Sequence, residues 1–553
     1  MKTNALYYGD NLDILRRYIP DESVDLVYLD PPFNSNRDYN VIFRDESGRK
    51  SDAQLVAFED TWHWGPDAER VYEYLTNTAR HEGRVPDNVS TIVAALHRGI
   101  GANQMMAYLV EMAARLVELH RVLKPTGSLY LHCDPTASHY LKVLLDAIFG
   151  PERFVNDIVW KRTTAHSSAK KYAPIHDTLL YYAKSSAVCW NEPRADYEDA
   201  YLDKYYKYDD GDGRLYWRAD ITAAGVRHGS SGAPWKGISP GAIGRHWQFP
   251  VDELDRLETE GRIYWPARGK MPQYKRYREE LKGRAVADIW DDVDRINPVG
   301  NERLGYPTQK PVALLERVIA TSSNPGDIIL DPFCGCGTAL VAAEKLGRQW
   351  IGIDITYLSI AVMKARLKDS FGLDDVEVIG QPTEVEGARQ LAVDHEGRYQ
   401  FQWWALGLVD ARPIGGTQKK GADKGIDGRI TFTDQHGKLE QVLISVKSGH
   451  VNASQIRDLK GTLEREKAVI GLFITLEEPT RNMREEAATA GFWHSDVWND
   501  DYERIQILSI ADLLERGKKP HLPAHAKLST YQQAQRVEMP MAAEQRELFG
   551  GDE

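Results

Sequence analysis

Short apolar runs alternate with amphipathic stretches between residues 1 and 153, and again between 302 and 372. Val24 to Leu29 is apolar apart from Asp25 and rich in strand formers, which predicts a buried parallel strand. Apolar residues recur at helical spacing from Met105 to Leu123, and a further apolar strand follows at 128–132. The same reasoning predicts strands at 5–8, 327–330 and 350–353, and helices at 11–18, 141–149, 312–320 and 339–346. This order of elements predicts an α/β fold.

Three other stretches lack this regular pattern. Residues 34–103 are polar and irregular and contain Trp62-His63-Trp64, which we interpret as packing within a long insertion, with a lid over a pocket as the alternative. Residues 154–301 are rich in Tyr, Trp, Gly, Lys and Arg, and 373–397 is acidic, as in a linker. Alternation resumes afterwards, with helices predicted at 399–409 and 456–465 and strands at 429–433, 441–447 and 469–475. We therefore expect a second α/β domain over 398–515, followed by a polar, loosely ordered tail at 516–553.

Composition narrows the class of protein without identifying it. A chain of 553 residues, 42% hydrophobic and 27% charged, is typical of a soluble protein with about two to four domains. Four scattered cysteines do not make a disulfide framework, and neither a signal-peptide pattern nor a long apolar run is present, so we expect a cytoplasmic protein without a membrane partner. The net charge of −12 gives no indication of nucleic acid, so any DNA surface must be a local basic patch.

The first chemically suggestive segment is Asp30-Pro31-Pro32-Phe33, directly after the strand at 24–29. Two prolines end the strand and stiffen the turn, because each fixes φ and neither donates a backbone N–H. An acid at the carboxyl end of a parallel strand lies where open α/β sheets bind ligands. The Asp30 carboxylate and the Pro31 carbonyl, beside the ring of Phe33, suit a planar amino group on an aromatic base. On these four residues alone, an ordinary turn is the competing interpretation.

The second segment is a glycine loop between a strand and a helix, Asp331-Pro332-Phe333-Cys334-Gly335-Cys336-Gly337-Thr338. Gly335 and Gly337 allow the backbone to approach a ligand closely at a helix N-terminus. Asp354 ends the next strand, where it can accept hydrogen bonds from both ribose hydroxyls. Leu340 stands where a dinucleotide fingerprint has its third glycine, which argues against a nicotinamide enzyme. The loop therefore predicts a nucleoside ligand without a pyrophosphate, such as S-adenosylmethionine.

A basic, aromatic segment lies between these two motifs. From Gly261 to Arg284 there are eight basic residues and two acids, with tyrosines and a tryptophan interleaved. Basic groups neutralise phosphates and aromatic rings stack on bases, so this segment suits nucleic acid, whereas a merely solvated face is the alternative. The candidate DNA-binding residues are Arg268, Lys270, Lys275, Arg276 and Arg278.

Taken together with Gly305 to Pro311, these motifs resemble the β-class DNA amino-methyltransferases, which are related to the modification subunits of type III restriction systems. The resemblance covers about residues 1–370 and implies a doubly wound, Rossmann-like methyltransferase fold with circularly permuted motif order. It implies a catalytic part at 1–153, a target-recognition region at 154–301 and a cofactor-binding part at 302–372. The implied S-adenosylmethionine ligands are Asp10, Lys310, Asp331, Phe333, Gly335, Gly337, Thr338 and Asp354, and the implied base-binding residues are Asp30, Pro31, Pro32 and Phe33.

The activity implied by the resemblance is methylation of an exocyclic base amine in double-stranded DNA, with the base flipped out of the duplex. An acid at the head of the tetrapeptide goes more often with adenine in that class, so Asp30 favours adenine N6 over cytosine N4. A methyltransferase acting on RNA or protein, or a DNA-binding protein with a dead site, are the other classes considered. The context implied is restriction-modification or phage defence, with restriction subunits as partners; a homodimer is left open.

Residues 398–515 resemble the Mrr-type restriction endonuclease domain of the PD-(D/E)xK nuclease fold. Asp427 matches the first metal-binding acid of that fold and Lys447 its catalytic lysine, but Ser445 replaces the usual second acid or glutamine. Mg²⁺ relies on hard carboxylate ligands, so we expect weak, conditional or absent cleavage unless another acid such as Glu440 reaches the site. The alternatives are an active methyltransferase-nuclease, and a scaffold that kept only its DNA surface.

Overall fold

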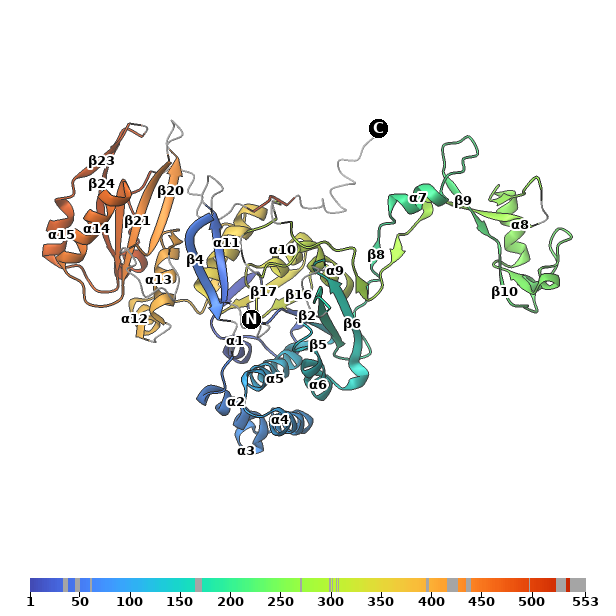
Figure 1. Cartoon of the computed structure of the whole chain (residues 1–553), viewed down its shortest axis with the longest axis horizontal. Helices are drawn as coiled ribbons and strands as arrows, with labels where there is room; N and C mark the ends of the chain where they lie inside the picture. Colours follow the sequence, from blue (N-terminus) through green and yellow to red (C-terminus); the bar gives the residue numbers. More distant parts are fainter. Residues whose placement is uncertain are drawn as a thin grey trace. The chain divides into compact units, whose positions relative to one another are not determined.

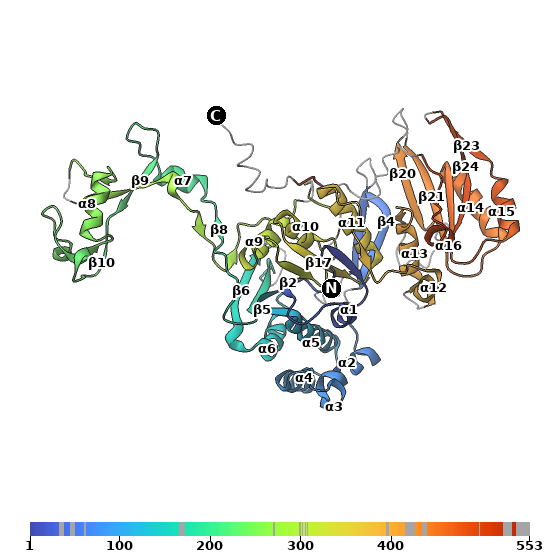
Figure 2. The same ribbon diagram turned by 180° about the vertical axis from the view of Figure 1, so that it is seen from behind.

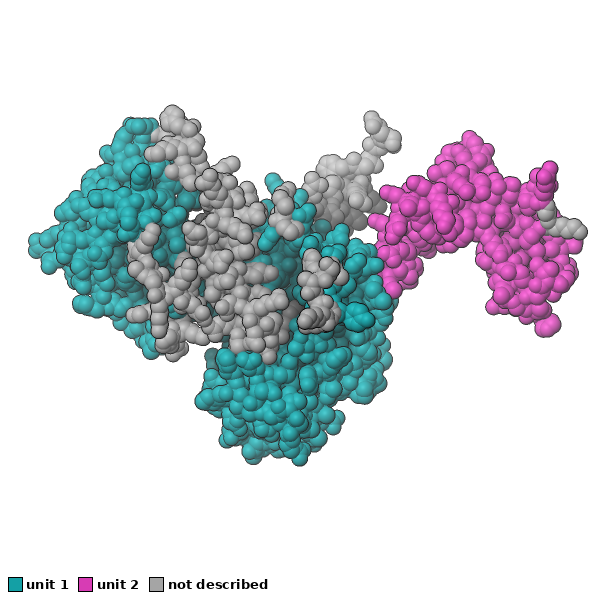
Figure 3. All heavy atoms as spheres, viewed as in Figure 1, with its two compact units in different colours: residues 1–191, 288–553 teal, residues 192–287 magenta. Residues whose placement is uncertain are grey.

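The computed structural model describes residues 1–32, 38–44, 50–59, 62–164, 172–268, 271–297, 300, 302–304, 306, 308–393, 397–414, 426–433, 439–496, 498–523 and 534–537. It divides into two compact units (Figure 3). The first comprises Met1–Asn191 and Asp288–Glu553, and the second comprises Glu192–Ala287.

The first unit is built around a sheet that has nine strands in the described chain, in the order β15-β6-β7-β5-β2-β16-β17-β1-β18. The strands are β1 (Ala5–Tyr8), β2 (Val24–Leu29), β5 (Leu123–Cys133), β6 (Phe154–Lys161), β7 (His176–Ala183), β15 (Ile289–Trp290), β16 (Ile328–Asp331), β17 (Gln349–Asp354) and β18 (Val378–Ile379). Only β7 runs antiparallel to its neighbours in this described sheet. The strands predicted from apolar runs in the catalytic and cofactor-binding parts are confirmed.

Helices cover both faces of this sheet (Figures 1 and 2). One face carries α1 (Asn11–Tyr18), α5 (Gln104–Val122) and α6 (Ser138–Phe149), and the other carries α9 (Val312–Ser322), α10 (Thr338–Lys345) and α11 (Tyr357–Phe371). Most of α5 is buried, because helices α2 (Pro66–Thr76) and α4 (Asp87–Ile100) pack against it in addition to the sheet. The doubly wound α/β architecture expected from the sequence is therefore present.

The irregular structure expected for 34–103 is wrong. The described part of this region forms a hairpin, β3 (Asp38–Arg44) and β4 (Lys50–Glu59), and helices α2 (Pro66–Thr76), α3 (Thr78–His81) and α4 (Asp87–Ile100). The apolar signal is sparse because these helices bury few residues: Ala68 and Leu75 on α2, and Val89 and Val93 on α4. The rest of each surface is polar, which hides the helical period.

The second unit spans fewer residues than the recognition region expected at 154–301. The difference arises at the N-terminal side because β6 and β7 belong to the main sheet. It contains α7 (Asp199–Tyr205), α8 (Val251–Thr259), β8 (Arg194–Ala195), β9 (Tyr216–Asp220), β10 (Thr222–Ala224), β11 (Arg245–Trp247), β12 (Ile263–Tyr264), β13 (Gln273–Tyr277) and β14 (Arg284–Ala285). Its own small core is built around the buried indoles of Trp235 and Trp247. Aromatic side chains thus serve its packing in the absence of a regular apolar period.

The C-terminal part of the first unit contains a five-stranded sheet, in the order β19-β20-β21-β22-β25 within the described chain. Its elements are β19 (Arg412–Pro413), β20 (Gly428–Thr433), β21 (Leu439–Lys447), β22 (Ile470–Thr475), β25 (Ile505–Ser509), α13 (Gly397–Gly407), α14 (Ala453–Glu466), α15 (Arg481–Ala488), α16 (Ile510–Leu514) and the hairpin β23 (Phe492–Ser495)–β24 (Asp500–Glu503). The helix–hairpin–helix–strand order predicted for this domain is confirmed. The stretch that we interpreted as a linker, 373–397, contains β18, which pairs with β1, and α12 (Val385–Val393).

One apolar cluster joins the two parts of the first unit. Tyr357 and Leu358 of α11 share it with Phe401 and Trp404 of α13. The backbone N–H of Tyr357 also donates to Gln400 Oε1 at 3.3 Å. Among the described residues, no helix has the length and apolar character needed to cross a bilayer.

Candidate active site

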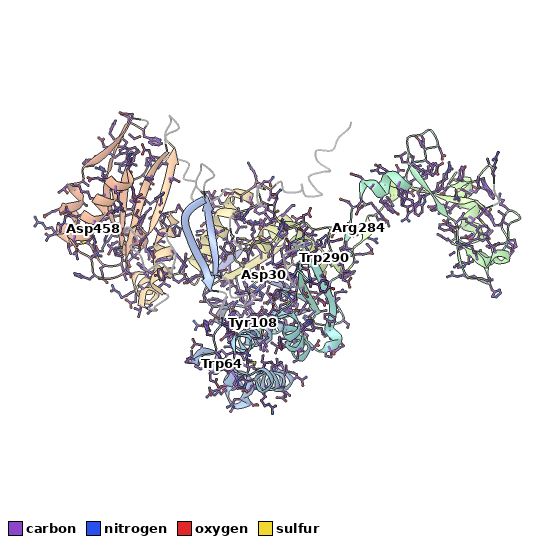
Figure 4. All side chains as sticks on the ribbon, in the orientation of Figure 1. Asp30, Trp64, Tyr108, Arg284, Trp290 and Asp458 are labelled. Carbon is purple, nitrogen blue, oxygen red and sulfur yellow. The ribbon has the colours of Figure 1, made fainter. Side chains whose placement is uncertain are left out.

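Three acids converge at the carboxyl ends of adjacent parallel strands. Asp30 follows β2, Asp331 ends β16 and Asp354 ends β17, and these strands are neighbours in the sheet. They border one cavity of about 720 Å³, a size typical of small-molecule sites. Figure 4 shows Asp30 in the body of the first unit, above Tyr108 of α5 in this view. The sequence predicted these acids separately, and the structure places them together.

Most of the predicted site residues border this cavity. Those that do are Asp10, Asp30, Pro32, Lys310, Asp331, Phe333, Gly335, Thr338 and Asp354. Pro31 and Gly337 are not among the lining residues, and Phe33 lies outside the described residues. Gly337 instead turns the backbone at the start of α10, with φ of 75° and Met363 packed where a side chain would be. Its role in the described structure is to shape the loop.

The glycine loop is tied directly to the acid of the next strand. The Gly335 N–H donates to Asp354 Oδ2 at 2.9 Å, and the Thr356 N–H donates to Asp354 Oδ1 at 2.9 Å. A Cβ at Gly335 would lie 3.2 Å from the ring of Tyr306, and the φ of 53° there also favours glycine. Burial raises the pKa of Asp354. The loop therefore presents backbone and carboxylate together to the cavity.

Asp331 is almost completely buried at the back of the loop. It is 4% exposed and accepts a hydrogen bond from the Phe333 N–H at 3.0 Å. Burial, with the negative charges of Asp30 and Asp354 nearby, raises its pKa to about 8. A positively charged ligand would relieve this accumulation of acids, because an opposite charge favours the ionised carboxylate.

Asp30 forms an ion pair with Lys310, and both side chains are largely buried. Lys310 comes from the segment before α9, which Gln309 holds in place: its amide donates to the Glu302 carbonyl at 2.6 Å and accepts from the Leu304 N–H at 2.8 Å. The lysine predicted as a cofactor ligand and the predicted catalytic acid are thus direct partners.

Asp10 is held by a network that the sequence did not reveal. Its carboxylate caps α1 by accepting from the Leu12 N–H at 2.8 Å, and accepts from Arg115 Nη2 at 2.7 Å. Arg115, on α5, also donates to Asn11 Oδ1 at 2.6 Å and Glu111 Oε2 at 2.6 Å, and all of these groups except Leu12 border the cavity. Arg115 lies about a hundred residues from Asp10 in the sequence, on a different helix, so no local pattern points to it.

The aromatic segment at 62–64 has the packing role that we expected. Trp62 lies against Tyr108 of α5, with ring centroids 5.8 Å apart, and Trp64 packs against Tyr72 of α2 (Figure 4). Trp62 and His63 also border the cavity, so this segment forms one of its walls.

The predicted DNA-binding residues of the second unit differ in whether they pair with an acid of the protein. Lys275 pairs with Asp210, whereas Arg268, Arg276 and Arg278 are exposed; Lys270 lies outside the described residues. Nearby, the guanidinium of Arg218 lies between the rings of Tyr208 and Tyr264, at 3.6 and 3.7 Å from their centroids. Several of the cations in this unit therefore have partners within the protein.

The predicted nuclease-like site consists of Asp427 and Lys447, whose Nζ lies 3.4 Å from the Asp427 carboxylate. The same carboxylate also accepts from the Val446 N–H at 2.6 Å, from Ser445 Oγ at 3.3 Å and from Gln402.

Glu440 does not complete this site, because it lies seven residues before Lys447 on the same strand, roughly 23 Å away. Among the described residues, no group of three or more potential metal ligands is found. A divalent-metal site at Asp427 therefore has no support here.

Comparison with known proteins gives separate matches for the N-terminal and C-terminal parts of the chain. Residues 24–362 match a family model described as DNA methylase, and the chain belongs to this family. Residues 414–515 match a model described as NACHT-associated inactive restriction endonuclease 1. The restriction-endonuclease-like character expected for the C-terminal domain is thus supported, whereas the more specific Mrr type is not tested.

Three relatives illustrate the similarity. The type II methyltransferase M.EcaI of Enterobacter cloacae is 38% identical over 249 residues, covering 45% of this chain and 54% of that protein. The Mod subunit of the type III restriction-modification enzyme StyLTI of Salmonella typhimurium is 26% identical over 364 residues, covering 63% and 50%. The DNA adenine methyltransferase YhdJ of Escherichia coli is 22% identical over 378 residues, covering 68% and 87%. The chain spans about half the length of the first two.

Proposed function

We propose that the protein transfers a methyl group from S-adenosylmethionine to the N6 amine of adenine in double-stranded DNA. The observation that carries this proposal is the meeting of Asp30, Asp331 and Asp354 in one cavity at the ends of adjacent strands. Methylases of the matched family and a relative named as an adenine methyltransferase support the same chemistry.

The cavity suits S-adenosylmethionine, which supplies an electrophilic methyl group on a positively charged sulfur. Asp354 accepts hydrogen bonds from ribose hydroxyls, and the backbone at Gly335 allows close approach of the ligand. Asp331, whose raised pKa keeps it mostly protonated in the free protein at neutral pH, supplies a negative charge when a cationic ligand favours its ionised form. Asp10, which Arg115 holds at the edge of the cavity, would contribute to holding the adenine end of the cofactor.

Asp30 and the Pro31 carbonyl accept hydrogen bonds from the target amine and thereby favour a localised nitrogen lone pair. Lys310 fixes the Asp30 carboxylate through their ion pair, so the acceptor is oriented before the base arrives. A base cannot reach this cavity while it is stacked in the duplex, so it must be flipped out. Alignment of donor and acceptor is the protein's main contribution.

The exposed arginines of the second unit are the proposed phosphate contacts. Arg276 is exposed, whereas its neighbour Lys275 is paired with Asp210, which makes the two a matched test. Replacing Arg276 by alanine is expected to weaken binding to duplex DNA and to lower the slope of log affinity against log salt by about 1. Lys275→Ala should have a smaller effect on both; an equal effect would remove this surface from the proposal.

We place the protein in a restriction-modification or phage-defence setting, as suggested by its type II and type III relatives and by its restriction-endonuclease-like domain. The C-terminal domain is proposed to contact DNA without cutting it, because the Asp427 carboxylate is already hydrogen-bonded within the protein. Restriction subunits are the partners that this setting would supply.

The test is methylation of unmodified genomic DNA with labelled S-adenosylmethionine, followed by nucleoside mass spectrometry and sequencing of the methylated sites. We expect N6-methyladenine at one short recognition sequence. A product containing only N4-methylcytosine would change the target base, and no incorporation into DNA would overturn the proposed function.

A further inference from the structure

A row of buried polar side chains runs across the main sheet beside Asp30. Tyr28 on β2 pairs in register with Tyr130 on β5, so His132 stands level with Asp30 on the neighbouring strand. Alternate residues of a strand point to the same face of a sheet, so Tyr28, Asp30 and His132 share one face. Asp177 on β7 continues the row through a contact with His132. The His132–Asp177 pair is thus connected, through Tyr28, to the cavity that Asp30 borders.

The hydrogen bonds along this row fix the direction of each proton. Tyr28 Oη lies 2.9 Å from His132 Nδ1, and His132 Nε2 lies 3.3 Å from Asp177 Oδ2. An ionised carboxylate only accepts, so in the neutral imidazole Nε2 carries the proton and Nδ1 accepts from the tyrosine. Burial by itself would raise the pKa of Asp177, but His132, Lys310 and Arg162 lower it, which keeps this carboxylate ionised. The Tyr28 proton therefore points at His132.

This orientation leaves the Tyr28 oxygen as an acceptor beside the reacting groups. Tyr28 borders the same cavity as Asp30 and Asp331, although it is only 2% exposed. Its hydroxyl reaches His132, which places the oxygen at the level of Asp30. Asp30 is itself engaged with Lys310, so one of its oxygens already faces an ammonium group. The amine must lose a proton on methylation, and Tyr28 is placed to take it.

We propose that Tyr28 accepts the proton lost by the target amine, while the His132–Asp177 pair orients Tyr28 and receives its original proton. This inference rests on the proposed function. As the N–CH₃ bond forms and the S–CH₃ bond breaks, the amine nitrogen carries one hydrogen in excess. Its N–H bond then breaks, the electron pair stays on nitrogen, and the proton goes to Tyr28 Oη. The Tyr28 O–H bond breaks in turn, and its proton goes to His132 Nδ1.

The resulting imidazolium of His132 faces the Asp177 carboxylate, so the positive charge is formed next to a negative one. Arg162, whose Nε lies 3.1 Å from Asp177 Oδ1, is 40% exposed and marks the side of the row nearest to solvent. The excess proton returns to water when the methylated product leaves, which restores the starting hydrogen bonds. Tyr28 is the catalytic residue in this scheme, and His132 and Asp177 are positioning residues.

The substitution Tyr28→Phe tests the proton transfer, with Tyr130→Phe as its matched control. Tyr130 is equally buried on the adjacent strand, and its hydroxyl is 2.8 Å from Ser322 Oγ, but it does not border the cavity. Tyr28→Phe is expected to lower the single-turnover rate of methyl transfer by about 100-fold, as for loss of a general base, with unchanged affinity for S-adenosylmethionine. Tyr130→Phe should retain the wild-type rate. Adding His132→Asn to Tyr28→Phe should cost little more, because both residues act in one path.

A second measurement does not depend on activity. Nitrogen NMR of the ¹⁵N-histidine-labelled protein, with His132→Asn to identify the signal, should show His132 protonated at Nε2 and accepting at Nδ1. A proton on Nδ1 instead would overturn the relay, as would a Tyr28→Phe rate equal to that of Tyr130→Phe. If the wild type itself transfers no methyl group to DNA, the proposed function fails and the relay with it; an active wild type with an undiminished Tyr28→Phe variant removes the relay alone.

Discussion

Two aspartate–lysine pairs at strand ends, Asp30–Lys310 and Asp427–Lys447, differ in the groups that surround them. Asp30 and Lys310 border a space of about 720 Å³ together with Asp331 and Asp354. Asp427 and Lys447 make the same kind of pair on the second sheet, but the Asp427 carboxylate also accepts from Gln402, Ser445 and the Val446 N–H. Beside the first pair, two further acids, Asp331 and Asp354, border the same cavity. At the second pair, the protein itself donates hydrogen bonds to the Asp427 carboxylate.

This contrast shows that an acid and a lysine at the right sequence positions are insufficient to define a site. Hydrogen-bond donors from the protein occupy the lone pairs that a metal ion would use at Asp427. At Asp331, by contrast, burial with few donors leaves the charged form uncompensated, and the raised pKa is the sign of it. Four predictions test the contrast.

The largest effect is expected from Asp30→Asn. The amide keeps the size of the side chain but removes the negative charge that faces Lys310 and one strong acceptor for the target amine. We expect the single-turnover rate to fall by about 100- to 1,000-fold, as when one preorganised polar partner of a transition state is lost. Affinity for S-adenosylmethionine, measured by calorimetry, should stay within a few-fold of wild type; a variant that binds poorly but reacts normally would reverse the assigned roles.

Asp354→Asn should act on binding instead. The amide retains one oxygen but cannot accept at both positions, so it either loses a ribose hydroxyl or releases the loop at the Gly335 N–H. A hydrogen bond to a charged group contributes about 1.5–3 kcal/mol, so the Kd for S-adenosylmethionine should rise by about 10- to 100-fold. Thr338→Ser, also at the cavity, serves as the conservative control. Unaltered affinity in Asp354→Asn would place the ligand elsewhere.

The pH dependence of binding should report on Asp331. With its pKa raised to about 8, the free protein holds this carboxyl mostly protonated at neutral pH. A cationic ligand favours the ionised form, so binding below pH 8 releases a proton and affinity rises with pH, by up to about tenfold per unit. The same raised pKa means that Asp331 contributes stability at low pH that is lost as the pH rises through 8. Calorimetry in buffers of different ionisation enthalpy measures the proton release, and Asp331→Asn should abolish it.

The smallest effect is expected at the second pair. Asp427→Ala should leave methyl transfer within about twofold of wild type, because Gln402, Ser445 and Val446, which donate to Asp427 in the described part of the chain, do not border the cavity. Ser445→Asp, which adds a carboxylate beside Asp427, should create measurable Mn²⁺ binding where the wild type has none. Metal binding by the wild type at this site, or DNA cleavage abolished by Asp427→Ala, would show that the pair is more than a structural contact.

The sequence predicted the structure best where residues close together in the chain determine the local fold. The apolar run before Asp30 and the glycine loop at Gly335 each predicted the end of a strand, and both predictions are confirmed. Those features depend on neighbours within a few residues. The helices at 66–100 were missed because only a few buried residues, such as Val89 and Val93, mark their inner face.

Groups that act across the fold left no local signal. Arg115 reaches Asp10 from more than a hundred residues away in the sequence, and His132 reaches Tyr28 from the neighbouring strand, so neither contact could be predicted without the fold. The same limit applies to charge: Lys275 looks like a DNA contact in sequence, but Asp210 is its partner in the fold. Only the fold shows which carboxylate oxygens already accept hydrogen bonds from the protein. This difference is what distinguishes the Asp30–Lys310 pair from the Asp427–Lys447 pair.

The most direct measurement follows DNA methylation and DNA cleavage in the same reaction. Duplex DNA free of prior modification is incubated with the protein, S-adenosylmethionine and Mg²⁺, and is then assayed for methylated nucleosides and for strand breaks. We expect N6-methyladenine in DNA that stays intact, formed about 100- to 1,000-fold more slowly by Asp30→Asn and at a nearly unchanged rate by Asp427→Ala. Cleaved DNA without methylation, or methylation by Asp30→Asn at the wild-type rate, would contradict the proposed function.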